Sequence, residues 1–380
     1  MKAYTIPKEL NYLAWVFSVF GLALFCNESP AQPSYTVVDI GNLGGPNVPG
    51  LPGNATAINN LGQVAGYSWT TAGTLHGFVY SAGRMTDLGT LGGMNSEADG
   101  INDSGQVVGY ALTGGSGQAA HAFLYTAGRM TDLGTFGGSG SYGLSINSAG
   151  QVVGHASLGD SMQSDHAFLY TAGAMTDLGT LGGIFSAARG INDSGQIVGY
   201  SGLTSVGDVM HAFLYSAGTM RDLGTLGGPS SFAWAINKRG QIVGSSDTSV
   251  GSTEAFLFED GIMTGLGTLG GSVSSATGIN DDGQVVGWSY IGGNQQHAFL
   301  YGGSAMYDLN DLISGPGIGT SLVSANAIND SGQIAAVGAN YHLYLLTIVP
   351  EPSPGSVTIM GAILMCSSIN KCRRLKKSAE

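Results

Sequence analysis

The sequence has few charged residues, few cations and no cysteine in its long central region. Only 10% of its 380 residues are charged, against roughly 25% in an average soluble protein. The formal net charge is -12, with 13 Lys and Arg residues. That balance argues against binding to nucleic-acid phosphates. The cysteines all lie near the two ends, at Cys26, Cys366 and Cys372, so the region between them has no disulfide, thiol nucleophile or cysteine metal site.

The residues that are abundant form a repeat. An Ile-Asn-x-x-Gly-Gln motif recurs between Tyr35 and Val349, with its asparagine at Asn59, Asn102, Asn147, Asn192, Asn237, Asn280 and Asn329. Subtracting neighbouring numbers gives steps of 43, 45, 45, 45, 43 and 49 residues. The 64 glycines fall at fixed offsets within the copies, which indicates turns. A repeat near 45 residues predicts one stacked or circular array in place of several unrelated domains.

Each copy contains four short segments of the kind that forms β-strands, rich in Val, Ile, Phe and Tyr and bounded by Gly, Asn, Asp and Ser. They are an Asp-Leu-Gly segment, a segment ending in Ile-Asn, a Gln-Val-Val-Gly segment and a His-Ala-Phe-Leu-Tyr segment. A hairpin joins the fourth segment to the next Asp-Leu-Gly segment, so the last sheet lacks its outer strand. Residues 35–41 can supply it by pairing with residues 342–349. The sequence therefore predicts an all-β, seven-bladed β-propeller over residues 35–349, with an open β-solenoid as the alternative.

The N-terminal segment has the layout of a secretory signal peptide over residues 1–31. Lys2 and Lys8 precede an apolar run from Leu10 to Phe25, and small residues follow it up to Ala31. This order of basic, apolar and small residues is typical of a cleaved export signal. An uncleaved membrane anchor is the alternative.

The C-terminal segment combines a proline-rich motif, a short apolar run and a basic tail. Pro350, Glu351 and Pro352 precede the run 355–369, and basic residues follow, including Arg373 and Arg374. Fifteen helical residues span about 22 Å, less than the roughly 30 Å of a bilayer core. The basic cluster would stay on the cytoplasmic side. We expect a short transmembrane helix that belongs to a processed sorting segment, or alternatively to an ordinary tail anchor with no processing.

Residues 349–377 resemble the PEP-CTERM sorting signal of Gram-negative bacteria. The resemblance implies an exosortase as a processing partner, cleavage near Pro350 to Pro352, and transient residence in the cytoplasmic membrane. The released protein would then reach the cell surface or the exopolysaccharide matrix.

The repeats themselves resemble the HAF family of extracellular repeats, named for the His-Ala-Phe that begins at His121, His166, His211 and His297. The resemblance covers residues 35–349 and the elements come in the family's order. Copies one, five and seven depart from it, beginning their fourth segment at His76, Glu254 and His342. The resemblance implies export, often with a sorting signal, and no known chemistry.

The histidine of each fourth segment is followed eleven residues later by an aspartate. The pairs are His76 with Asp87, His121 with Asp132, His166 with Asp177, His211 with Asp222 and His297 with Asp308. Across a hairpin such positions lie within hydrogen-bond reach. In copy five Glu254 and Gly265 replace both partners together, so we interpret the pairs as structural links. A shared metal ion is less consistent with one histidine on each blade.

Two further positions are candidates for ligand binding. The Asn-Asp-Ser-Gly turns suggest calcium, yet the residue after the asparagine is an aspartate in only four of seven copies and a lysine in one, which favours plain turns. The residue after the Gln-Val-Val-Gly glycine is a large aromatic at Tyr67, Tyr110, Tyr200 and Trp288. These rings could stack on sugars at one rim, or pack between blades.

We expect an exported, non-enzymatic protein of the cell surface or biofilm matrix that binds or fills extracellular polysaccharide. The sequence marks no catalytic residue, cofactor or nucleic-acid site. One alternative is a glycan-active enzyme with its site at the propeller mouth, and another is a purely structural surface protein. Non-repeated polar residues clustered at one mouth would favour the enzyme. The variable segments 111–120 and 201–210 are the loops expected to carry specificity.

Overall fold

The computed structural model describes residues 32–45, 53–115, 118–159, 164–204, 209–293 and 295–350. The predicted signal peptide lies outside the described residues, as does the predicted sorting signal from Glu351 onward, including Pro352, Arg373 and Arg374. All the strands belong to one compact unit, Ser34–Glu380. No helix within the described ranges is long and apolar enough to cross a membrane.

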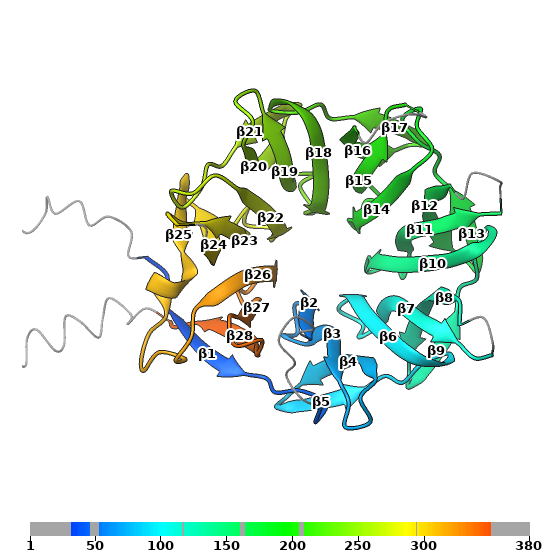
Figure 1. Ribbon diagram of the computed structural model, residues 1–380, viewed down its shortest axis with the longest axis horizontal. Coiled ribbons are helices and arrows are strands. Elements are labelled where there is room, and N and C mark those ends of the chain that lie inside the picture. Colours follow the sequence, from blue (N-terminus) through cyan, green and yellow to red (C-terminus); the bar gives the residue numbers. More distant parts are fainter. Residues whose placement is uncertain are drawn as a thin grey trace, which may run out of the picture. The chain divides into compact units, whose positions relative to one another are not determined.

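Seven four-stranded antiparallel sheets, or blades, form a ring in this unit (Figure 1). Blade 1 contains β2 (Asn54–Ile58), β3 (Val64–Trp69), β4 (Leu75–Ser81) and β5 (Arg84–Asp87). Blade 2 contains β6 (Gly92–Ile101), β7 (Val107–Thr113), β8 (Ala120–Thr126) and β9 (Arg129–Asp132). Blade 3 contains β10 (Gly137–Ile146), β11 (Val152–Leu158), β12 (Asp165–Thr171) and β13 (Ala174–Asp177). Blade 4 contains β14 (Ser186–Ile191), β15 (Ile197–Gly202), β16 (Met210–Ser216) and β17 (Thr219–Asp222).

Blade 5 contains β18 (Gly227–Ile236), β19 (Ile242–Thr248), β20 (Thr253–Glu259) and β21 (Ile262–Gly265). Blade 6 contains β22 (Ser274–Ile279), β23 (Val285–Tyr290), β24 (Gln296–Gly302) and β25 (Ala305–Asp308), and the 3-10 helix η1 (Leu309–Leu312) follows it. Blade 7 contains β26 (Leu322–Ile328), β27 (Ile334–Gly338), β28 (Leu343–Ile348) and, from the other end of the chain, β1 (Tyr35–Asp39).

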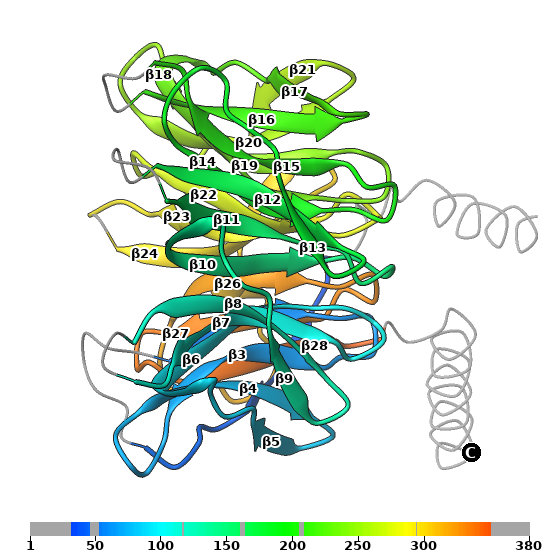
Figure 2. The ribbon, with the colours of Figure 1, turned by 90° about the vertical axis from the view of Figure 1, so that its right-hand side faces the viewer.

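Blade 7 closes the ring. Strand β1 pairs antiparallel with β28, placing Tyr35 opposite Ile348 and Asp39 opposite Tyr344. The predicted seven-bladed propeller and its closure by the N-terminal strand are therefore confirmed, and the solenoid alternative is wrong. In every blade the strand ending in Ile-Asn is innermost (Figure 1), and the blades stack face to face when the ring is seen from the side (Figure 2).

The hydrophobic core is divided into one cluster for each interface between blades. Ala122 and Phe123 are consecutive in β8 and both fully buried, yet Ala122 packs with Val152 and Phe168 of blade 3 while Phe123 packs with Ala65 of blade 1. Successive side chains of a strand point to opposite faces, and both faces of each sheet are covered by a neighbouring blade. Because both faces of the strand are buried, each copy needs two consecutive apolar residues at this point, and the repeat supplies Ala and Phe.

The glycine of the Gln-Val-Val-Gly segment is required by a close approach of backbones. At Gly109, an added Cβ would overlap the carbonyl oxygen of Glu97 on the neighbouring strand. A bulge follows in the same ladder between Ala98 and Gly100. The inner strand is thereby held tightly against the second strand, which fixes the side chains that face the centre of the ring.

Candidate functional site: two cavities at the centre of the ring

The seven asparagines of the repeated motif form a closed ring of hydrogen bonds. Each Nδ2 donates to the backbone carbonyl of the asparagine in the next blade, from Asn59 to Asn102 at 3.0 Å and finally from Asn329 back to Asn59 at 2.9 Å. The intermediate steps have the same form. Within each turn the Oδ1 accepts from the backbone N–H of the glutamine four residues on, and Nδ2 also donates to that glutamine's Oε1. The Ile-Asn-x-x-Gly-Gln motif is therefore the unit of a cyclic bonded array, which we call the asparagine ring.

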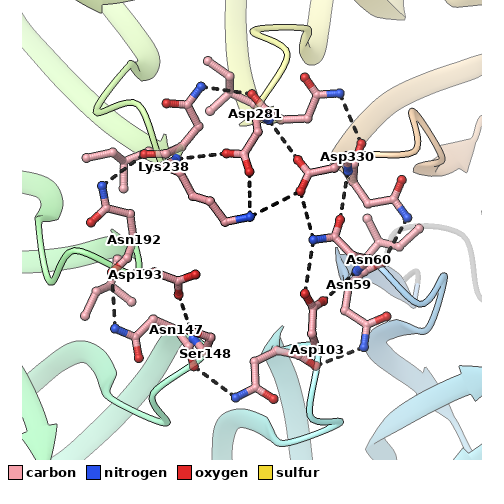
Figure 3. A pocket seen from close by; sticks show the side chains of 18 of the residues that line it. Asn59, Asn60, Asp103, Asn147, Ser148, Asn192, Asp193, Lys238, Asp281 and Asp330 are labelled. Carbon is pink, nitrogen blue, oxygen red and sulfur yellow. Dashed lines mark hydrogen bonds and ion pairs between the residues drawn. The ribbon is translucent and has the colours of Figure 1, made fainter.

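The residues that follow the asparagines surround a cavity of about 240 Å³ (Figure 3). Four are acidic, Asp103, Asp193, Asp281 and Asp330, and one is Lys238. Lys238 Nζ lies 2.8 Å from Asp281 and 3.6 Å from Asp330. Partial burial raises the pKa of Asp281, but its hydrogen bonds with Lys238 and the lysine charge outweigh burial and leave that pKa below its usual range. The lysine pKa is raised, first by its hydrogen bond with Asp281.

The calcium hypothesis for these turns gains no support from the geometry. Asp103 Oδ1 accepts from the backbone N–H of Asn60 and Asp281 Oδ1 from that of Lys238. The carboxylates are thus used to bond one blade to the next. Among the described residues, no group of three or more His, Cys, Asp or Glu side chains is arranged to hold a metal ion.

All five predicted His–Asp pairs are hydrogen-bonded across the hairpin between the third and fourth strands of their blades. The distances from histidine Nδ1 to the carboxylate lie between 2.6 and 3.0 Å. The same carboxylates accept a backbone N–H two residues on, as Asp87 does from Gly89 at 2.7 Å. Each pair therefore ties the outer hairpin to the connection that leads into the next blade.

A sixth pair, His342 with Asp39, was missed because its partners come from opposite ends of the chain. The predicted pairing of residues 35–41 with residues 342–349 was the signal that could have found it. In blade 5, a Cβ at Gly265 would lie 2.7 Å from the Glu254 carboxylate. The longer acidic side chain fills the space that the aspartate occupies elsewhere.

Above the asparagine ring, the positions three residues before each asparagine form a second layer, which we call the inner layer. Its members are Thr56, Asp99, Leu144, Arg189, Trp234, Thr277 and Asn326, and together with Asn54 they line a cavity of about 260 Å³, the inner cavity. No two neighbouring blades place the same residue there. A search for residues that recur in every copy could not find this layer, because its seven positions carry different residues in neighbouring copies.

The two sides of the inner layer differ in hydrogen bonding. In blades 1, 6 and 7 the side chain donates to a carbonyl of the next blade: Thr56 to Ala98 at 2.7 Å, Thr277 to Ala325 at 2.7 Å and Asn326 to Ala55 at 3.0 Å. In blades 2, 4 and 5 a buried polar atom has no partner within the described structure: Asp99 Oδ2, Arg189 Nε and Trp234 Nε1.

The carboxyl groups of blade 2 lie in a poorly solvated environment. Burial raises the pKa of Asp99 to about 7, and the neighbouring Glu97 adds to the rise while Arg189 opposes it. Burial also raises the pKa of Glu97, and its hydrogen bond with Tyr110 opposes that rise.

The hydroxyl of Tyr67, in blade 1, is also poorly solvated. Its pKa is raised to about 12, chiefly by burial.

Aromatic rings form an arc next to the inner cavity, running through blades 2 to 5. Ring centroids are separated by 4.9 Å for Tyr110–Tyr142, 4.8 Å for Tyr142–His155, 6.0 Å for His155–Phe185, 5.8 Å for Phe185–Tyr200, 5.0 Å for Tyr200–Phe232 and 6.1 Å for Phe232–Trp234. All of these rings are partly exposed. We call this set the aromatic arc.

Of the four aromatic residues predicted to stack on sugars, only Tyr110 and Tyr200 belong to the arc, where they pack against rings of the next blade. Tyr67 lines a separate cavity of about 450 Å³ beside blade 7. Trp288 contacts Tyr290 of its own blade at 5.6 Å. The remaining arc members were not recognised as a group. His155 has the same offset as Tyr110 and Tyr200 but is not one of the large aromatic residues, and the others precede the Ile-Asn motif at offsets where an aromatic residue occurs in only one or two copies.

No protein-family model matches the sequence, and no curated protein matches it. Among solved structures, the chain is similar to a puromycin-hydrolyzing peptidase of Mycobacterium tuberculosis (12% identity, 81% of this chain and 53% of that one, TM-score 0.53). It is also similar to the β-propeller domain of the Trilobed protease of Pyrococcus furiosus (8% identity, 80% and 97%, TM-score 0.51). A third similar structure is the BP39L lectin of Burkholderia pseudomallei (12% identity, 83% and 96%, TM-score 0.44).

The chain spans about half the length of the peptidase. At these identities the likeness concerns the fold alone: the class of protein is a seven-bladed β-propeller. The HAF and PEP-CTERM resemblances stay predictions.

Proposed function

We propose that this protein is exported and that its propeller binds extracellular polysaccharide without transforming it. The observation that supports this function best is the aromatic arc beside the inner cavity, where partly exposed rings adjoin hydroxyl, amide and carboxyl groups. Sugar rings present apolar faces that pack on aromatic side chains and hydroxyls that require polar partners. Binding sites commonly combine an apolar lining with a few convergent polar groups in this way.

The export route belongs to the same proposal and rests on the sequence. Residues 1–31 would direct secretion, and residues 350–377 would hold the chain in the cytoplasmic membrane until an exosortase cleaves near Pro350, Glu351 and Pro352. Mass spectrometry of the protein recovered from its native host would test this. Peptides from residues 1–31 or beyond Arg373 in the surface-associated form would contradict processing.

Polysaccharide binding can be tested by co-sedimentation of the purified protein with exopolysaccharide from the native host, with and without EDTA. We expect saturable binding that EDTA does not change. Replacing Tyr142 or Phe232 by alanine should weaken binding about tenfold, which is about 1.4 kcal/mol, because it removes an aromatic face on which a sugar ring can pack. Tyr290→Ala, in blade 6 and outside the arc, is the control. Absence of binding in either buffer would exclude this function and leave the structural alternative.

A second candidate function is a glycan-active enzyme, and the inner layer provides the observation that favours it. Asp99 and Glu97 are non-repeated carboxyl groups with raised pKa values, and a carboxyl with a raised pKa is what a general acid needs near neutral pH. Release of reducing ends from the bound polysaccharide, lost in Asp99→Asn, would establish the enzyme. Binding without release of reducing ends would favour the non-enzymatic protein.

A further inference from the structure

One side of the inner layer has hydrogen-bonding capacity that the protein does not use. Two unpartnered donors, Arg189 Nε and Trp234 Nε1, and one unpartnered oxygen, Asp99 Oδ2, belong to residues that line the same cavity. Leaving a buried polar atom unpaired costs roughly 1–3 kcal/mol. Three such atoms at one cavity indicate that their partner is supplied from outside the chain.

Arg189 is held in one orientation by its neighbours. Its Nη2 donates to the Tyr200 hydroxyl at 3.1 Å. Its guanidinium carbon lies 5.0 Å from the Trp234 ring centroid and 5.5 Å from that of Tyr200. These contacts fix the guanidinium plane and leave Nε without a partner. A guanidinium fixed in this way is suited to a planar acceptor that takes two N–H bonds.

The charges around the inner cavity indicate which chemical groups a ligand bound there would carry. Arg189 is the one cation among the described residues that line it, and Asp99 is the one acid. The remaining polar side chains are amides and hydroxyls, on Asn54, Thr56, Thr277 and Asn326. A ligand with one carboxylate and several hydroxyl groups matches this set, with its carboxylate at Arg189 and a hydroxyl at Asp99.

We propose that the inner cavity binds the carboxylate of an acidic sugar, a uronic acid unit of a polysaccharide, through Arg189 and Trp234, with Asp99 accepting a sugar hydroxyl. The proposal rests on the polysaccharide-binding function above and names its ligand class. The volume of about 260 Å³ is slightly below the 300–1,000 Å³ typical of small-molecule pockets, so one sugar unit enters while the adjoining units lie along the aromatic arc.

The test compares an oligogalacturonate with its methyl ester, which has the same shape and no charge. Binding is measured by titration calorimetry on the purified full-length protein. We expect the free acid to bind about tenfold or more tightly than the ester, since hydrogen bonds to charged groups contribute more than neutral ones. Arg189→Gln should remove that preference, because the affinity for the acid falls to about the affinity for the ester. Arg221→Gln, on the exposed outer strand β17 of the same blade, should behave as the wild type.

Two more variants keep the test informative where Arg189→Gln fails to fold. Arg189→Lys keeps the charge and loses the planar fork, so it should reduce the preference part of the way. Trp234→Phe keeps the ring and loses the Nε1–H, and should weaken binding of the acid alone. Equal affinity of the wild type for acid and ester overturns the inference and leaves polysaccharide binding intact. Failure of the wild type to bind any polysaccharide overturns the proposed function itself.

Discussion

The asparagine ring and the inner layer lie three residues apart along the seven inner segments, yet they differ in residue identity and in how completely their polar atoms are hydrogen-bonded. In the asparagine ring all blades carry the same residue, and each side chain bonds the next blade. In the inner layer the residues differ, and three polar atoms are unpaired. A repeated position with complete hydrogen bonding stabilises the ring. A varied position with unsatisfied groups is where a ligand is expected, because native proteins retain such groups mainly at functional sites.

The largest effect should come from breaking the asparagine ring. Asn147→Ala leaves Gln151 Oε1 and the Gln151 backbone N–H without their partner, and it removes one of two bonds to the Asn192 carbonyl, which still accepts from the Gly195 N–H. At 1–3 kcal/mol for each of the two unsatisfied groups and about 1 kcal/mol for the lost bond to the carbonyl, we expect a loss of about 3–7 kcal/mol in the free energy of unfolding. Urea unfolding measures it, with the exposed neighbour Ser148→Ala as control. A loss below 1 kcal/mol would show that the ring is not needed for stability.

In the inner layer, the ionised Asp99 side chain should destabilise the fold, whereas the asparagines stabilise it. Its pKa is about 7 in the folded protein, above the usual 3.9 of an unfolded chain. Between those values the folded state holds a proton that the unfolded chain releases, so the free energy of unfolding falls by up to about 4 kcal/mol as the pH rises from about 4 to about 7. The charged groups acting on Asp99 are Glu97 and Arg189. Asp99→Asn should match the wild type at pH 4 and be more stable at pH 8. Unfolding curves with the same pH dependence in both proteins would contradict this.

An apolar residue in place of Arg189, whose Nε–H has no partner, should sharpen this comparison. Leu144 already occupies this layer in blade 3, so Arg189→Leu is compatible with the site. Because it removes a partly buried charge whose Nε–H has no partner, we expect stability to rise by about 1 kcal/mol while binding of the acidic sugar is lost. Thermal unfolding and calorimetry together check it. Loss of stability would mean that Arg189 has a structural role like that of the asparagines.

The His–Asp pairs should give a smaller effect than the asparagine ring. They are partly exposed, with side-chain exposures of 18% and 41% for His211 and Asp222. His211→Ala should cost about 1 kcal/mol, since exposed or half-exposed pairs contribute little. Glu254→Gln in blade 5, which has no such pair, is the control. A cost as large as that of Asn147→Ala would mean that the pairs, too, are essential to closure.

The smallest effect should come from the acidic turns around the cavity of about 240 Å³ at the asparagine ring. Lys238→Met removes ion pairs from a side chain that is 56% exposed, so we expect a change of less than about 1 kcal/mol, and one that salt reduces further. EDTA should leave the melting temperature of the wild type unchanged. A decrease with EDTA that added calcium restores would revive the calcium hypothesis for Asp281 and Asp330.

Much of the fold followed from regular spacing. The recurrence of Ile-Asn-x-x-Gly-Gln predicted the number of blades, and the unpaired last sheet predicted the pairing of β1 with β28. The eleven-residue spacing predicted where His76 and Asp87 would meet. These predictions succeed because each depends on neighbours within one hairpin or on a single missing strand. The same reasoning missed His342 with Asp39, whose spacing is not local.

The candidate site was harder to predict because its members share neither a residue type nor a neighbourhood in the chain. The blade, its turns and the number of copies can be predicted from the chain alone, since these arise from local hydrogen bonding and alternating burial. That Asp99, Arg189 and Trp234 line one cavity follows only from the closed ring. Side chains from three different blades meet there because closing the ring brings the same offset of every inner strand to a common axis.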